Sequence, residues 1–211
     1  MRISLCIKRL IDFIGSTLGI VLISPILIIV ALAIKLTSKG PVLFKQERIG
    51  KDGRVFTILK FRTMVVNAEN IGAGLFIYGD SDSRITKIGR VLRSASLDEL
   101  PQLLNVIKGD MSLVGPRPPA VYYPYKGYEN YPDWAKVRFK MRPGITGLAQ
   151  VRVRTTEAWD KRMVFDIEYT EHFNILMDIK ILINTVKTVL LRKNIYPESS
   201  DRLENTKNDI A

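Results

Sequence analysis

The sequence predicts a mixed α/β chain, mainly helical, in which a membrane-embedded N-terminal helix precedes a small domain with amphipathic helices. Residues 13–34 contain no charged side chain and, at about 1.5 Å per residue, are long enough to cross a bilayer's hydrocarbon core. Residues 42–50 and 55–61 are typical of two strands joined by the turn 51–54. Apolar side chains recur at helical spacing in residues 175–192, and residues 156–173 also indicate a helix.

The composition narrows the class of function. The 211 residues include 32 Lys and Arg against 21 Asp and Glu, and the net charge of +11 favours an anionic partner. A single cysteine, Cys6, excludes an internal disulfide and fits a reducing compartment. A single histidine, His172, excludes a histidine-based metal cluster or a catalytic triad within the chain and is expected to be structural. No P-loop, GxGxxG or CxxC pattern is present, so a nucleotide would need another kind of site.

The N-terminal segment carries a helix break and positive charge on both flanks. Ser24 and Pro25 lie in the middle of the uncharged run, where proline removes a helix hydrogen bond and bends the axis. Positive residues mark the cytoplasmic side, and they stand before and after the run: Arg2, Lys8 and Arg9, then Lys35, Lys39, Lys45, Arg48, Lys51 and Arg54. A spanning helix and a helix that returns to the same face both remain open. We expect Asp12, inside the apolar pattern, to pair with Lys8 or Arg9.

Residues 93–119 form the most distinctive stretch of the chain. Pro101 places a helix start within a few residues of itself, so Asp98 and Glu99 lie at a helix N-terminus, where free N–H groups and the helix dipole favour charged carboxylates. With arginines nearby, this pattern indicates a nucleophile or a metal ligand. Ser96 and Glu99 also fit a capping box, and this structural interpretation stays open.

Several other segments allow two interpretations. Lys60 and Arg62 end the second strand and predict either a solvated face or a phosphate contact near the membrane. Asp80 and Asp82 weakly match the D-x-D pattern that binds metal in many nucleotide-sugar glycosyltransferases. Residues 132–141 predict a short basic amphipathic helix, either at a membrane interface or packed on the domain. Residues 148–153 are expected to form a strand, and residues 196–211 a disordered polar tail.

Taken together, these segments resemble the bacterial sugar transferases, a family of monotopic phosphoglycosyl transferases, from about Lys8 to Arg192. The matching strings are KRxxD at 8–12, the Ser24-Pro25 break, FxQxRxG at 44–50, KFRTM at 60–64, LRxxSLDELPQ at 92–102, GDMSLVGPRP at 109–118 and RPGITG at 142–147. The resemblance implies a re-entrant helix in residues 1–39, a cytoplasmic-face catalytic domain in 40–195 with interfacial amphipathic helices, and the tail in 196–211.

The resemblance also implies an activity. A sugar 1-phosphate would pass from a UDP-sugar to polyprenyl (undecaprenyl) phosphate with release of UMP, as the first membrane step of surface-glycan assembly. Mg²⁺ is the implied cofactor, and the implied place is the bacterial inner membrane in contact with phospholipid. Nucleic acid is not an implied partner. Later glycosyltransferases of the same pathway and a second copy of the chain are partners that the family allows.

By resemblance, individual residues receive roles. Asp98 is the nucleophile that forms an aspartyl-phosphosugar intermediate and a ligand of Mg²⁺, and Glu99 assists with metal or proton handling. Arg117 is expected to clamp phosphate with support from Arg93. Further phosphate or substrate contacts are expected from Lys60, Arg62, Arg142 and Asp166. The same resemblance makes Asp80 and Asp82 an ordinary motif before the catalytic helix.

One segment departs from the family pattern. After Gln150-Val151 the family commonly has Asn-Gly-Arg-Asn, whereas this chain has Arg-Val-Arg-Thr at 152–155. Arg154 keeps its place, but both asparagines and the glycine are lost. The identity of the sugar therefore does not follow from typical relatives.

Overall fold

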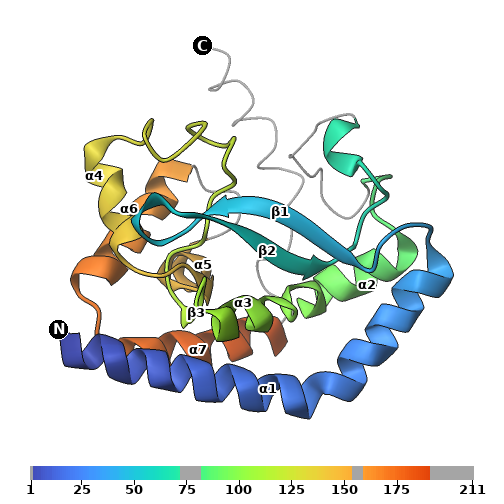
Figure 1. Cartoon of the computed structure of the whole chain (residues 1–211), viewed down its shortest axis with the longest axis horizontal. Coiled ribbons are helices and arrows are strands. Elements are labelled where there is room, and N and C mark those ends of the chain that lie inside the picture. Colours follow the sequence, from blue (N-terminus) through green and yellow to red (C-terminus); the bar gives the residue numbers. More distant parts are fainter. Residues whose placement is uncertain (1, 72–81, 154–158, 191–211) are drawn as a thin grey trace.

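The computed structural model describes residues 2–71, 82–153 and 159–190, and a long bent helix forms its base (Figure 1). That helix is α1 (Arg2–Thr37); α3 packs on it, a β-hairpin lies above α3, and α7 is joined to it by an ion pair between Lys8 and Asp178. The helices are α1 (Arg2–Thr37), α2 (Lys87–Ser94), α3 (Gln102–Lys108), α4 (Asp133–Lys136), α5 (Leu148–Arg152), α6 (Trp159–Glu171) and α7 (Ile175–Leu190). The predicted tail 196–211 lies outside the described residues.

Helix α1 confirms the predicted N-terminal helix. Pro25 lies inside it, the Ser24 hydroxyl donates to the Val21 carbonyl at 2.9 Å, and the helix axis turns sharply in this half of α1 (Figure 1). A proline inside a helix is a sufficient cause for such a bend. Within the described residues, α1 is the one helix long and apolar enough to cross a membrane, and most of its apolar side chains are exposed. Membrane association follows from this exposed apolar helix.

The N-terminal half of α1 is fastened to the domain by a buried polar network. The Lys8 ammonium lies 2.6 Å from Asp178 on α7 and 3.9 Å from Asp12. The Asp12 carboxylate also accepts hydrogen bonds from the Ser112 hydroxyl at 2.7 Å and the Leu113 N–H at 3.0 Å. The expected pairing of Asp12 with Lys8 is confirmed, and it links the membrane helix to two distant parts of the chain.

The predicted hairpin is also confirmed. Strand β1 (Leu43–Ile49) pairs antiparallel with β2 (Val55–Phe61) in a register that joins Leu43 to Phe61. The connecting turn holds Asp52 and Gly53 at φ of 55° and 78°, the left-handed conformation that short hairpin turns require. A second pair of strands, β3 (Ser112–Val114) and β4 (Gly144–Thr146), runs parallel.

Glycines allow the two parallel strands to approach closely. A Cβ atom on Gly115 would lie 2.4 Å from the Arg142 carbonyl oxygen, and one on Gly144 would lie 2.1 Å from the Gly115 nitrogen. Both distances are too short for a real side chain. The chain that leaves β3 is therefore held against β4 at a fixed position, which matters because it carries Arg117.

Two sequence expectations change in the structure. Residues 148–153 were expected as a strand, but Leu148–Arg152 is helix α5. The strand ends at Thr146, and Leu148 and Ala149, both good helix formers, are buried in the turn that follows. Residues 132–141 form two short helical pieces, α4 (Asp133–Lys136) and a 3₁₀ segment (Val137–Lys140), instead of one amphipathic helix.

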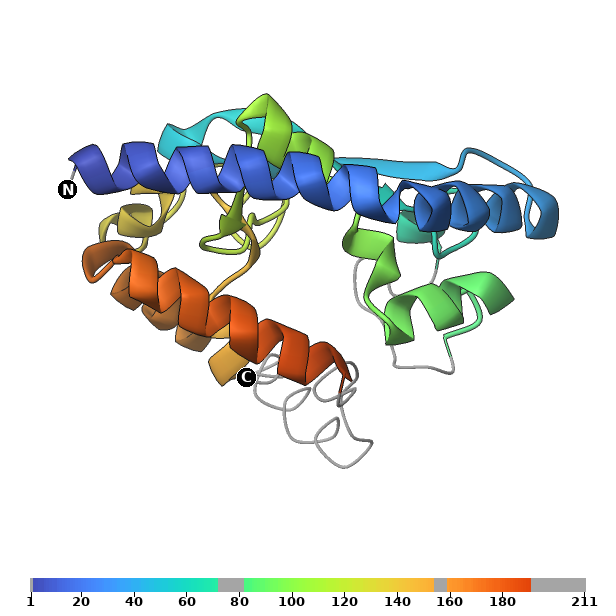
Figure 2. The same ribbon diagram turned by 90° about the horizontal axis from the view of Figure 1, so that it is seen from below.

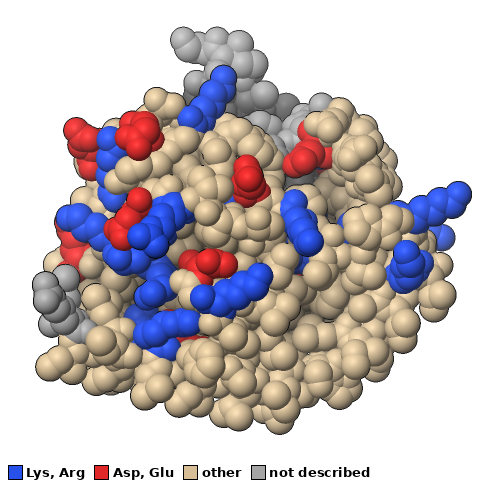
Figure 3. Space-filling model, viewed as in Figure 1, with Lys and Arg blue, Asp and Glu red and all other residues tan. Residues whose placement is uncertain are grey.

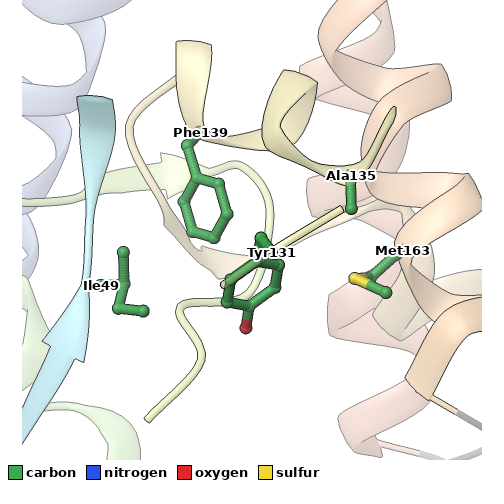
Figure 4. Packing of buried hydrophobic residues seen from close by; sticks show 5 residues of the cluster. All are labelled: Ile49, Tyr131, Ala135, Phe139 and Met163. Carbon is green, nitrogen blue, oxygen red and sulfur yellow. The ribbon is translucent and has the colours of Figure 1, made fainter. Parts of the chain in front are cut away.

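These two pieces pack on the domain core. Ala135 and Phe139 lie in one cluster with Ile49 of β1, Tyr131 and Met163 of α6 (Figure 4). The ordinary-packing interpretation of residues 132–141 is therefore the correct one for Phe139, although Trp134 remains exposed.

Helices α6 and α7 confirm the two predicted C-terminal helices over the described residues. Helix α7 begins near the N-terminal half of α1, where the Lys8–Asp178 ion pair joins the two helices, and it then diverges from α1 (Figure 2). One side of α7 buries Ile181, while the other side exposes Leu176, Ile179, Ile183 and Val186. Helix α7 thus has an exposed apolar side, as α1 does.

Candidate active site

Asp98 and Glu99 lie in a single 3₁₀ turn (Leu97–Glu99) between α2 and α3. Ser96, which precedes the turn, has a φ of 54° and makes no side-chain cap hydrogen bond. The capping-box interpretation is therefore wrong, because the serine is in the left-handed region instead of the extended conformation that a cap requires. Helix α3 begins just after Pro101, as the proline predicts.

Glu99 is fixed by two cations. Its Oε1 atom lies 2.5 Å from the Lys60 ammonium and 3.3 Å from the Arg117 guanidinium. Burial opposes ionisation of Glu99, but Lys60 and Arg117 outweigh it and lower its pKa to about 2. Glu99 is consequently a permanent anion that holds Lys60, at the end of β2, and Arg117, after β3, at one point.

Asp98 is in a different electrostatic state. Burial raises the pKa of the half-buried Asp98 carboxyl and the adjacent Glu99 charge raises it further, while Lys60 and Arg93 oppose the shift. The neighbouring carboxylates are therefore tuned in opposite directions. Such a separation is typical of sites in which one carboxylate reacts and the other orients its surroundings.

The turn that carries Arg117 is held by two arginines, the half-buried Arg48 and the buried Arg138. The Arg48 guanidinium donates to the Pro118 carbonyl at 2.9 Å, and Arg138 donates to the Arg117 carbonyl at 2.7 Å. Arg138 is itself in a buried ion pair with Asp166 of α6. These contacts fix the backbone that directly follows the Arg117 side chain.

Arg48 and Arg138 are residues that the sequence did not identify as part of the site. Arg48 lies in the FxQxRxG string, but nothing in the spacing shows that it reaches residue 118. Arg138 lies in a basic segment, where a solvated face is the ordinary expectation, yet it is only 2% exposed. The burial of a charged residue is a tertiary property, so no local signal could have found it.

The structure brings some of the predicted site residues together. Lys60, Arg93 and Arg117 all surround the Asp98–Glu99 turn, and Arg93 is further oriented by the Thr63 hydroxyl at 3.4 Å. Asp166 lies beneath the Arg117 turn, 3% exposed and paired with Arg138, in a supporting position instead of at the surface of the site.

Two predicted residues lie elsewhere. Arg62 is buried and donates to the Pro41 carbonyl at 2.6 Å and to the Ser38 carbonyl at 3.1 Å, so its guanidinium ties the far end of α1 to the hairpin. Arg142 donates to the Gly109 carbonyl at 2.8 Å, at the end of α3 opposite to Asp98. A helix of seven residues is about 10 Å long. Arg142 is thus not a neighbour of the carboxylate pair, and the guanidinium of Arg62 is occupied by the residues that follow α1.

The D-x-D pattern has no support from Asp82. Its carboxylate accepts hydrogen bonds from the backbone N–H and the guanidinium of Arg84, with an ion-pair distance of 2.7 Å, and it is buried. A carboxylate used in this way stabilises its own turn. Asp80 lies outside the described residues.

The altered segment after residue 151 is described only in part. The Arg152 guanidinium binds both carboxylate oxygens of Glu168 on α6 at 2.7 Å and lies over the Phe165 ring. Arg154 and Thr155 lie outside the described residues. The first substituted position therefore contacts α6.

The described residues could bind Mg²⁺ only together with phosphate oxygens of the substrate. Among the described residues, no group of three or more His, Cys, Asp or Glu side chains could hold a metal by itself. Mg²⁺ does not require one, since it commonly binds one or two carboxylates together with substrate phosphates and water. The Asp98 carboxylate, which is not drawn into the Lys60 and Arg117 ion pairs of Glu99, fits that pattern.

The site therefore places the Asp98 carboxylate, whose pKa is raised, beside a group of cations. Lys60, Arg93 and Arg117, with Arg48 close behind, provide the charge that a diphosphate needs. Comparison with known proteins agrees with this chemistry, because the family model for bacterial sugar transferases matches residues 3–192.

The chain belongs to the bacterial sugar transferase family.

Its relatives include proteins named for the transfer of sugar phosphates to a lipid carrier. The chain is 44% identical over 194 residues to a UDP-glucose:undecaprenyl-phosphate glucose-1-phosphate transferase of Caulobacter vibrioides, covering 90% of this chain and 72% of the relative. It is 41% identical over 187 residues to a UDP-N-acetylgalactosamine-undecaprenyl-phosphate N-acetylgalactosaminephosphotransferase of Aeromonas hydrophila, covering 87% of this chain and 44% of the relative.

The extent of the match differs between relatives. An exopolysaccharide production protein of Rhizobium leguminosarum is 42% identical over 196 residues, which covers 89% of this chain and 97% of that protein. Against the Aeromonas protein, by contrast, the chain spans less than half of the relative's length. These alignments cover 90%, 87% and 89% of this chain, so each of them includes the candidate site around Asp98.

Proposed function

We propose that this transferase moves a sugar 1-phosphate from a UDP-sugar to undecaprenyl phosphate and releases UMP. The names of its relatives support the donor and acceptor classes. The observation that carries the proposal is the arrangement around residue 98: a half-buried carboxylate with a raised pKa, next to a second carboxylate that gathers Lys60 and Arg117.

In the first step, an oxygen of the Asp98 carboxylate attacks the β-phosphorus of the donor. A new bond forms between that oxygen and phosphorus, and the bond from the β-phosphorus to the bridging oxygen breaks. UMP leaves with the bridging oxygen, and the sugar phosphate remains on Asp98 as an acyl phosphate. Deprotonated Asp98 is required, since a neutral carboxyl is a poor nucleophile.

In the second step, a phosphate oxygen of undecaprenyl phosphate attacks the phosphorus of the acyl phosphate. The bond to the Asp98 oxygen breaks, the carboxylate is restored, and the product is an undecaprenyl diphosphate sugar. Two sequential displacements let one carboxylate serve a water-soluble donor and a lipid acceptor in turn.

The surrounding residues stabilise charge. Phosphoryl transfer depends mainly on positioning and on neutralising the phosphate oxygens, which Arg117, Lys60 and Arg93 are placed to do. Glu99 keeps Lys60 and Arg117 in position through its ion pairs. Mg²⁺, held by Asp98 with the donor's phosphates, would add Lewis-acid charge to the diphosphate.

The membrane helix is proposed to enter and leave on the cytoplasmic face of the inner membrane. Three observations support this: α1 is bent (Figure 1), positive residues stand on both of its flanks, and both ends contact the domain. Lys8 holds one end to α7, and Arg62 holds the other to residues 38–41. A straight spanning helix could not contact one domain at both ends.

Nucleotide release tests the proposed function. Purified chain in detergent with undecaprenyl phosphate and Mg²⁺ should release UMP from one member of a panel containing UDP-glucose, UDP-galactose and UDP-N-acetylgalactosamine. Asp98→Asn should release none above background, while the matched exposed variant Asp133→Asn should keep the parent's rate. The active donor identifies the sugar, which neither the residues nor the relatives decide.

The alternatives give different products. A D-x-D glycosyltransferase would release UDP instead of UMP, an outcome that would overturn the proposal. A membrane-anchored binding protein would release no nucleotide, and Asp98→Asn would leave its ligand binding unchanged. Trapping the acyl phosphate with radiolabelled donor, in the absence of acceptor, distinguishes covalent transfer from direct transfer.

A further inference from the structure

A second group of cations surrounds a pocket at the opposite end of α3 from Asp98 and Glu99. Among the residues that line it are Leu5, Arg9, Asp12, Lys51, Lys140 and Arg142. They come from the first turns of α1, from the hairpin turn, and from the segment before β4. Lys8 also lines the pocket, so five cations there face one carboxylate.

The single carboxylate is already used inside the protein. Both oxygens of Asp12 accept hydrogen bonds from residues 112 and 113, and Lys8 is engaged by Asp178. The Arg9 guanidinium is occupied too, since it donates to the Val106 and Ile107 carbonyls at 2.6 and 3.0 Å. Its charge and that of Lys8 nevertheless remain part of the positive pocket.

The other three cations are available to a ligand to different degrees. Lys140 is exposed, and Lys51 makes an ion pair at 2.7 Å with Asp52 in which both side chains are about half exposed, so solvent screens the pair. Arg142 uses its Nε atom for the Gly109 carbonyl. That contact orients the guanidinium toward the pocket without neutralising it.

The pocket borders the apolar surface of the molecule. Leu5, Arg9 and Asp12 line the pocket from α1, and on the same stretch of that helix the side chains of Ile3 and Leu10, which do not line it, are 77% and 59% exposed. Figure 3 shows the consequence: the lower edge, where α1 lies, is almost free of charge, and Lys and Arg gather directly above its N-terminal half. If the apolar surface of α1 faces lipid tails, these cations lie at the level of the headgroups.

We infer that this pocket binds the phosphate of an anionic phospholipid headgroup and thereby orients the N-terminal half of α1 in the membrane surface. Basic clusters beside a membrane-embedded helix attract anionic lipids, and a pocket with several donors can contact one phosphate from more than one direction. The site is separate from the transfer reaction, because the length of α3 lies between it and Asp98.

A lipid-binding measurement tests the inference on the full chain. Protein in neutral detergent micelles is titrated with short-chain phosphatidylglycerol or phosphatidylcholine, and binding is followed by native mass spectrometry. The double variant Lys51→Gln with Lys140→Gln should bind phosphatidylglycerol at least about tenfold more weakly, since it removes two charge-assisted contacts. Phosphatidylcholine should bind weakly to the parent and to the variant.

A matched control removes the same charge elsewhere. Lys45 and Lys87 are exposed and do not line the pocket, so Lys45→Gln with Lys87→Gln should keep binding within about threefold of the parent, as surface substitutions away from a site usually cost little. Both double variants should melt within about 3 °C of the parent for the same reason.

Three outcomes would overturn the inference. Equal losses in both double variants would mean that diffuse charge, and not the pocket, attracts the lipid. Equal binding of phosphatidylcholine and phosphatidylglycerol to the parent would mean that net headgroup charge is not recognised. Displacement of phosphatidylglycerol by inorganic phosphate at matched ionic strength would assign the pocket to a free phosphate.

Discussion

Replacing Asp166 with asparagine removes the charge that compensates a buried guanidinium. Arg138 is 2% exposed and Asp166 is 3% exposed, so neither group can be solvated by a small movement. Breaking a buried pair in this way costs about 3–5 kcal/mol, against a total stability of about 5–15 kcal/mol for a typical domain. For a chain of this size, we expect Asp166→Asn to lower the melting temperature by roughly 6–20 °C.

Removing both charges separates stability from positioning. In the double variant Arg138→Met with Asp166→Leu no charge is left unpaired, and such replacements are often neutral or stabilising. The melting temperature should therefore recover. Turnover should not, because the Arg117 carbonyl has lost the donor that lies 2.7 Å away in the parent. A displacement of about 1 Å in a charge-stabilising group can cost roughly 100-fold in rate.

The assays are thermal unfolding and UMP release, both on purified chain in detergent. Glu168→Gln is the matched control, since Glu168 also lies on α6 but forms a largely exposed ion pair with Arg152. A melting temperature unchanged in Asp166→Asn would refute the buried-pair argument. Recovery of both melting temperature and turnover in the double variant would show that Arg138 does not position Arg117.

Three further predictions follow from the site and its frame. The acid limb of the pH profile of kcat/KM should lie at higher pH than an ordinary aspartate would give, because burial raises the pKa of Asp98. Lys60→Met should move this limb to higher pH, because Lys60 lowers the pKa of Asp98, and Glu99→Gln should move it to lower pH, because the Glu99 charge raises that pKa. Shifts in the opposite directions would contradict the proposed electrostatics. Gly115→Ala should destabilise the chain and lower turnover together, since its Cβ atom would lie 2.4 Å from the Arg142 carbonyl oxygen; denaturant unfolding and UMP release measure both effects, and a neutral result would mean that β3 and β4 can separate at no cost. Arg152→Asn, which restores a residue common in the family, should change stability by less than about 1 kcal/mol because its ion pair with Glu168 is exposed, and an altered donor preference would show that this position reaches the sugar.

The sequence by itself determined the local elements. Apolar periodicity and uncharged length predict α1, α6 and α7, two strand-like segments around the turn 51–54 predict the hairpin, and Pro101 predicts where α3 begins. Family resemblance added the Asp98–Glu99 pair and the expected roles around it. These features are readable because each depends on neighbours in the chain: a helix period, a turn conformation or a proline without its N–H group.

Only the tertiary structure decided which charged residues are buried and what they contact. Three arginines in basic segments have different roles in the structure. Arg62 binds the residues that follow α1, Arg138 supports the Arg117 turn, and Arg142 lines a separate pocket. Ser96 and Glu99 match a capping box, yet Lys60 and Arg117, brought from β2 and the turn after β3, hold Glu99 instead. The physical reason is that burial and ion pairing depend on groups far apart in the chain, which a local pattern does not specify.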